Sequence, residues 1–170
     1  MDKAITTALL IIVSMMMVIM LFNIAYPAVI SGGEAMVGMT NRVEDRMNQQ
    51  VNIIHITSEL DHHGTWQDEG SGQFEVFAWV KNVGSARIAP FEQLDVFFGP
   101  EGNFARIPHQ SAAGGSYPHW TGHIENNSNW DPTASLRITI NYGASPLAQG
   151  RYFMKVVTPS GVSDDGFVGF

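Results

Sequence analysis

The chain contains no cysteine among its 170 residues. It therefore cannot form a disulfide bond, a thiolate metal site or a thiol nucleophile. It also holds none of the patterns G-x-S-x-G, P-loop, G-x-G-x-x-G, H-E-x-x-H or EF-hand loop. We therefore expect no catalytic residue, no cofactor and no bound metal, and a protein that is not an enzyme.

Charge is missing from one long stretch near the N-terminus, because no charged residue lies from Ala4 to Gly33. A helix of about 30 residues would be about 45 Å long, enough to cross the hydrocarbon core of a bilayer. The apolar run is too long for the hydrophobic region of a cleaved secretory signal. Lys3 is the only basic residue before Arg42, which favours a cytoplasmic N-terminus with the rest of the chain outside.

Positive charge is scarce in the remainder, and the formal net charge of the chain is −7. An acidic surface repels phosphate groups, so the charge disfavours nucleic acid as a partner. About 110 residues follow the hydrophobic part, which is enough for one domain with its own core.

An amphipathic pattern follows the uncharged stretch, with Met36, Thr40, Val43, Met47 and Ile54 at helical spacing. The pattern predicts that the helix continues to about residue 56 if it survives Pro27 and the Gly32-Gly33 pair. Its apolar stripe would pack either on the chain's own β domain or on neighbouring copies.

Alternating apolar residues begin after residue 60 and predict strands at Gln73–Lys81 and Ala134–Tyr142. Further candidate strands are Gln93–Phe98, Phe104–Ile107, Tyr152–Val157 and Gly166–Phe170. The pattern indicates an α+β protein, with a long N-terminal hydrophobic α-helix followed by an all-β immunoglobulin-like sandwich. We place the hydrophobic helix at 1–33, an amphipathic continuation and linker at 34–60, and the sandwich at 61–170.

Several side chains on the β domain have two interpretations. Phe77 and Trp79 would face either another subunit or a core packed on both sides of the strand. Histidines occur at His62-His63 and at His119 with His123, and we expect surface loops there rather than metal ligands. Asn126-Asn127-Ser128 matches the acceptor pattern for N-glycosylation, with Asn126 as the modified residue.

Two short motifs give the chain a resemblance to a known family. They are Val80-Lys81-Asn82-Val83-Gly84 and Leu94-Asp95-Val96-Phe97, and the closing stretch 150–167 adds to them. With the N-terminal helix, these resemble archaeal flagellins (archaellins) and the minor archaellum stator proteins. The resemblance implies either a filament subunit or one of the proteins that anchor the rotary motor to the cell envelope.

The family also implies a leader removed by a prepilin-type peptidase just before the hydrophobic run. In this sequence only Met1-Asp2-Lys3-Ala4 could serve, with a cut between Ala4 and Ile5. Ile5 would then be the new N-terminus.

A filament would bury the uncharged helices against one another in a central bundle and keep the acidic sandwich outside. The residues expected to form the contacts are Leu9, Ile12, Met16, Ile19, Met20, Phe22, Met36, Val43 and Met47. Our first interpretation is therefore an extracellular filament subunit for motility that polymerises with itself and lies in the membrane before assembly. The archaellum motor platform would be a further partner.

The alternative interpretation is a membrane-anchored archaellum stator protein whose β-sandwich binds the cell envelope. A membrane-tethered enzyme or solute-binding domain is a third class, and no motif supports it. The amphipathic continuation of the helix beyond membrane thickness favours the filament subunit.

Overall fold

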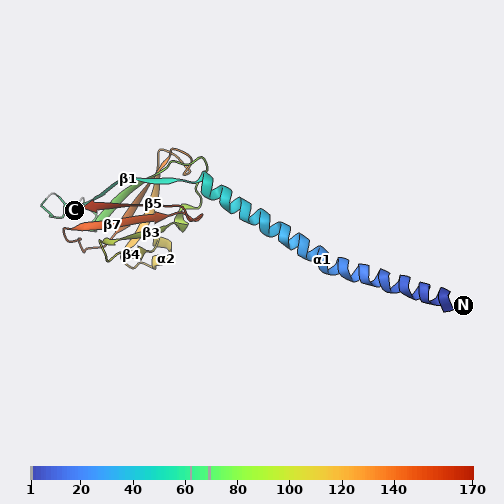
Figure 1. Cartoon of the computed structure of the whole chain (residues 1–170). Helices are drawn as coiled ribbons and strands as arrows, with labels where there is room; N and C mark the ends of the chain where they lie inside the picture. The colour runs from blue at the N-terminus through green and yellow to red at the C-terminus, as the bar shows by residue number, and fades with distance from the viewer. Residues whose placement is uncertain (1, 62, 69) are drawn as a thin grey trace. The chain divides into compact units, whose positions relative to one another are not determined.

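The computed structural model describes residues 2–61, 63–68 and 70–170. The chain divides into two units, of which the first ends at Val43 and the second comprises Glu44–Phe170. A helix leads into a β-sandwich, and Figure 1 shows these elements in order along the chain. The expected fold class, a long N-terminal hydrophobic helix followed by a β-sandwich, is therefore confirmed.

Helix α1 (Asp2–Asn48) is 47 residues long and continues through Pro27, Gly32 and Gly33. At 1.5 Å per residue it measures about 70 Å, more than twice the thickness of a bilayer's hydrocarbon core. Within the described residues, it is the one helix long and apolar enough to cross a membrane.

The C-terminal end of α1 differs from the sequence expectation. We expected the helix to run to about residue 56, but it ends at Asn48 and strand β1 (Val51–Ser58) follows. The compact second unit begins at Glu44, so it includes residues that we had assigned to a linker. The segment is held as a strand because it pairs with β2 (Glu75–Asn82) along its whole length.

Six further strands and two short helical turns complete the second unit. They are η1 (Phe91–Gln93), β3 (Asp95–Pro100), β4 (Ala105–Ile107), α2 (Gln110–Ala113), β5 (His119–Glu125), β6 (Ser135–Asn141), β7 (Arg151–Val157) and β8 (Ser163–Gly169). The six strands expected from alternation are all present within a few residues of their expected bounds. Strands β1 and β5 were missed.

The strands form two antiparallel sheets of four, in the orders β1-β2-β6-β5 and β4-β3-β7-β8. Alternate residues of each strand point between the sheets and form one core. Its largest fully buried side chains include Trp120, Trp130, Phe74 and Phe98. Edge strands β1 and β8 are joined by Asp164, whose carboxylate accepts a hydrogen bond of 2.7 Å from the backbone N–H of Ile53.

The last turn of α1 is fixed to connections of both sheets within the second unit. The backbone oxygen of Asn48 accepts hydrogen bonds from the N–H groups of Ser85 (2.8 Å) and Ala86 (3.1 Å), which follow β2. The Arg46 guanidinium donates to the backbone oxygen of Ser160 (2.8 Å), in the turn between β7 and β8. The two bonds to Asn48 satisfy a carbonyl group that a helix end otherwise leaves without a partner.

Candidate functional site

The apolar surface of α1 is the most extensive candidate interaction surface of the molecule. All nine residues expected to make helix contacts lie on α1, and their exposed fractions range from 54% at Val43 to 81% at Met47. An apolar surface of this size is not stable in water, so lipid or other protein must cover it. The role of each residue in polymerisation stays a prediction.

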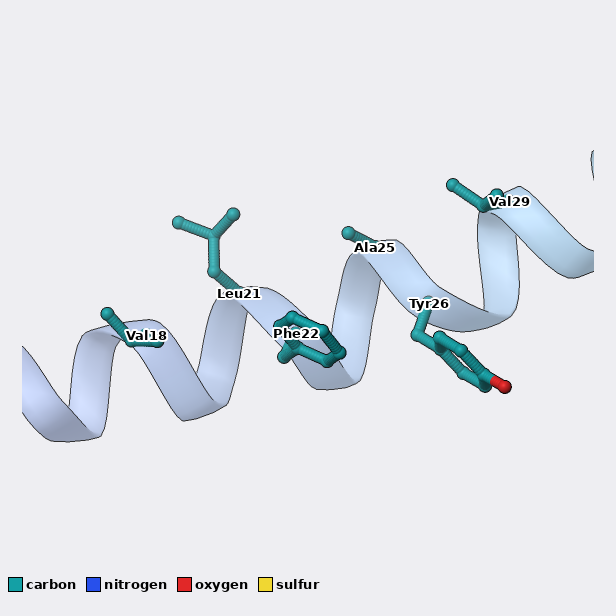
Figure 2. Close-up of a pocket in the computed structure, with 6 residues that line it drawn as sticks. All are labelled: Val18, Leu21, Phe22, Ala25, Tyr26 and Val29. Atoms are coloured by element: carbon teal, nitrogen blue, oxygen red, sulfur yellow. The ribbon is translucent and has the colours of Figure 1, made fainter.

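One stretch of this surface forms a shallow hollow of about 430 Å³ between Val18 and Val29. Figure 2 shows its six lining side chains, all from the same helix. Phe22 and Tyr26 lie one turn apart, with stacked rings whose centroids are 6.4 Å apart. The lining is apolar and offers no group for catalysis. It suits contact with lipid chains or with another helix.

The expected leader site, Ala4 and Ile5, lies in the first turns of α1, and both residues are exposed. Cleavage between them stays a prediction.

The outer face of the first sheet carries aromatic and polar side chains. Phe77 and Trp79 are half-buried on β2 and alternate with the buried residues Val76, Ala78 and Val80. A core on both sides of this strand is therefore not formed within the described part of the chain. The Trp79 ring lies 6.3 Å from the Phe77 ring and 5.8 Å from the His55 ring of β1. This aromatic row stays available for an external partner.

A polar cleft of about 570 Å³ opens on the same sheet, at the end of β2 where Glu75 lies. The strand register places Glu75, Asn141 and His119 side by side across β2, β6 and β5. Tyr117 and Gln110 of α2 also line it. The cleft adjoins the aromatic row through a shared strand, β2.

The outer face of the second sheet carries a separate cluster of phenylalanines. The Phe153 ring lies 4.6 Å from Phe104 and 5.2 Å from Phe167. The Arg151 guanidinium carbon lies 4.3 Å above the Phe167 ring, a cation–π arrangement. A hollow of about 250 Å³ lies beside this cluster, lined by Phe167 and its neighbours on β8 and by residues 53–56 of β1.

Two of the histidines that we expected in loops are placed differently, whereas His63 lies in an exposed turn. His119 and His123 lie on strand β5, where four residues span about 13 Å, too far to share one metal ion. His119 is 8% exposed, and its Nδ1 lies 2.9 Å from the backbone oxygen of Ser116. His62 lies outside the described residues, and within them no group of three or more metal-ligating side chains occurs.

The acidic loop before β2 uses its carboxylates internally. Asp61 accepts hydrogen bonds from the N–H groups of His63 and Thr65, both 2.8 Å long. Asp68 accepts from Gly70 (2.8 Å) and Gly72 (3.1 Å). These carboxylates stabilise their own turns.

Asn126 lies in an exposed turn between β5 and β6, and its φ is 56°. Asparagine is one of the few residues that adopts this left-handed conformation readily. Exposure suits an acceptor for glycosylation, which stays a prediction at this residue.

No protein-family model and no curated protein sequence matches the chain. Among solved structures, the chain is similar to the archaellum periplasmic stator protein FlaG from Sulfolobus acidocaldarius, with a TM-score of 0.54 and 27% identity. The match covers 71% of this chain and 99% of that one. The chain is also similar to the archaellum periplasmic stator protein complex FlaF and FlaG from the same organism. That match has a TM-score of 0.53 and 28% identity, and covers 70% of this chain and 88% of that one.

The fold and surfaces define a class of protein with one membrane-length helix and a β-sandwich that offers surfaces for binding. Within this class, the chain resembles the archaellum stator proteins, which confirms the resemblance stated from its motifs. Both similar structures are of archaellum periplasmic stator proteins.

Proposed function

We propose that this protein is a membrane-anchored stator component of an archaellum. The observation that carries the proposal is the similarity to the FlaG stator protein, which extends over 99% of that chain at 27% identity. Both solved structures described above are stator proteins, and neither is a filament subunit. They therefore favour the stator alternative over the filament subunit, which was our first interpretation from sequence.

In this proposal α1 spans the cytoplasmic membrane and the sandwich lies on its outer side. Lys3 marks the cytoplasmic end, and the uncharged stretch from Ala4 to Gly33 has the length that a bilayer requires. The sandwich would contact the cell envelope and a second stator protein of the FlaF kind, because one similar structure is a complex of FlaF and FlaG.

A second candidate function is self-association through α1, which is compatible with a stator assembly or a filament. Met36, Val43 and Met47 lie beyond the uncharged stretch and within about 40° of one another around the helix. All three are exposed. Because the helix is longer than the hydrocarbon core of a bilayer is thick, this apolar stripe would be exposed to water unless another chain covers it.

Fractionation of cells tests the stator proposal. Cells are sheared, the released filaments are pelleted, and the chain is quantified in filaments and envelope by mass spectrometry. A stator component remains with the envelope and is scarce relative to the major filament protein. Dominance of this chain in the filaments would refute the stator proposal and restore the filament subunit. The same spectra report whether the N-terminus is Ile5.

Self-association is tested on the full chain in membranes by crosslinking. Val43→Lys places a charge on the stripe, whereas Asn41→Lys places the same charge about 160° away around the helix. We expect Val43→Lys to lose crosslinked oligomers and Asn41→Lys to retain them. Equal crosslinking of both variants would show that the stripe is not the contact.

A further inference from the structure

The polar cleft on the first sheet has a lining with a definite chemical preference. Its wall contains amide groups from Gln73, Gln110 and Asn141, together with the Glu75 carboxylate. Among the described residues that line it, there is a single carboxylate and no lysine or arginine. A phosphate or sulfate would find no lysine or arginine there, and an oxygen-ligated metal ion such as Ca²⁺ would need more carboxylates. The lining suits a neutral ligand with many hydroxyl groups.

The polar groups of the cleft are held in position by one another. The Asn141 side-chain amide donates to the Gln73 side-chain oxygen and, at 3.2 Å, to the Glu75 carboxylate. The Asn141 side-chain oxygen accepts a hydrogen bond of 2.8 Å from Gly143 N–H. Asn141 is 8% exposed. A polar network fixed in this way presents its planar groups without the entropic cost of ordering them on binding.

An aromatic ring completes the cleft. Tyr117 is 48% exposed, and its ring stacks on the His119 ring at 5.0 Å with an interplanar angle of 28°. A Cβ added to Gly143 would lie 3.1 Å from the Tyr117 ring, so the ring packs closely against this glycine. The electron-rich face of an aromatic ring attracts the weakly positive C–H groups on one face of a sugar. Amide and carboxylate groups form hydrogen bonds with the hydroxyl groups at the edge of the sugar.

The cleft continues into the aromatic row along β2. Glu75, Phe77 and Trp79 alternate with core residues on one strand, so all three lie on its outer face. The distance from Glu75 to Trp79 along the strand is about 13 Å. This length accommodates an extended ligand, with one unit in the cleft and further units over the Phe77 and Trp79 rings.

We infer that the outer face of the β1-β2-β6-β5 sheet binds a neutral glycan chain. The polar cleft holds one sugar residue through Tyr117 and the amides around Asn141. The Phe77 and Trp79 rings carry the sugar residues that follow. This inference concerns a ligand of the sandwich and does not depend on the stator proposal, which is tested by location.

The test uses the full chain in detergent micelles and a microarray of neutral oligosaccharides built from hexose and N-acetylhexosamine units. The best oligosaccharide is then titrated by calorimetry. We expect Tyr117→Ala and Phe77→Ala each to weaken binding by about tenfold, since each removes a stacking surface. Gln110→Ala, at the start of the exposed helix α2, tests the amide wall without altering the core.

Phe104→Ala is the matched control, because Phe104 is 47% exposed and lies beside the phenylalanines of the other sheet. It should leave the affinity unchanged. The inference would be overturned by the absence of binding to any neutral oligosaccharide at millimolar concentration, or by an equal loss of affinity in Phe104→Ala and Tyr117→Ala. Binding of a second protein to this face, with no glycan bound, would also overturn it.

Discussion

A Cβ atom on Gly84 would lie 2.4 Å from the backbone oxygen of Asn48 and 2.6 Å from the backbone nitrogen of Gln50. The turn after β2 therefore touches the end of α1 backbone against backbone. Asn82 supports the turn from inside, because its buried side-chain amide donates to the backbone oxygens of Ala86 (2.9 Å) and Trp130 (3.1 Å). These contacts explain the asparagine and glycine of the Val80–Gly84 motif.

Gly84→Ala is expected to destabilise the sandwich by about 2–4 kcal/mol, because backbone atoms cannot move aside as a flexible side chain can. All four tryptophans of the chain lie between residues 66 and 130, so fluorescence in denaturant reports on this unit. Gly169→Ala is the control, since nothing lies within 4 Å of the added atom. Equal midpoints for the two variants would contradict the proposed contact.

The pKa of Tyr142 leads to a prediction of how the stability of the sandwich depends on pH. Burial raises the pKa of Tyr142 to about 12, and the nearby Tyr152 phenol adds to the effect. Because an unfolded tyrosine titrates near pH 10, the stabilisation is fully present below about pH 10. It is lost as the pH rises to about 12. Tyr142→Phe should match the parent at neutral pH and lose less stability above pH 10, as measured by denaturant titration across that range. Parallel curves would contradict this assignment.

Ile19 lies near the middle of the uncharged stretch, so a substitution there tests whether α1 spans a bilayer. Arginine at the centre of a spanning helix costs about 2.5–3.5 kcal/mol on insertion scales. We expect Ile19→Arg to reduce the fraction of chain that resists alkaline extraction from membranes. Asn41→Arg lies beyond the stretch and should leave that fraction unchanged. Resistance of both variants would indicate that Ile19 is not in contact with lipid.

Asn126 is expected to carry a glycan when the protein is isolated from its own cells. Mass spectrometry of the peptide that contains it should show an added mass, which Ser128→Ala removes while leaving Asn126 in place. Asn52 lies outside this acceptor pattern and serves as the unmodified reference. An unmodified peptide throughout the preparation would disprove the prediction.

The strands that sequence predicted are those in which alternation is unbroken, such as β2 and β6. Strand β1 was missed because its register shifts between Ile53 and His55, which interrupts the alternation and leaves Ile54 exposed. Strand β5 was missed because an inward position is Gly122. A Cβ there would lie 2.9 Å from the Phe91 ring, so a small residue is needed where an apolar one was expected.

The polar cleft could not be predicted from the sequence. Its residues come from the stretches 73–75 and 110–121 and from Asn141, and only the order of the strands brings them together. The apolar surface of α1, in contrast, was evident because it is continuous along the chain. A local sequence pattern identifies a surface that lies on one helix or strand. A surface built from several strands can be identified only once the pairing of those strands is known.

The last turn of α1 determines how the sandwich carries a mechanical load. Asn48 is bonded to the connection after β2 in the first sheet, and Arg46 to the turn between β7 and β8 in the second. Tension that arrives along the chain at this point is divided between the two sheets. A pull on α1 would therefore have to break hydrogen bonds to both sheets before it could peel the edge strand β1 away from β2.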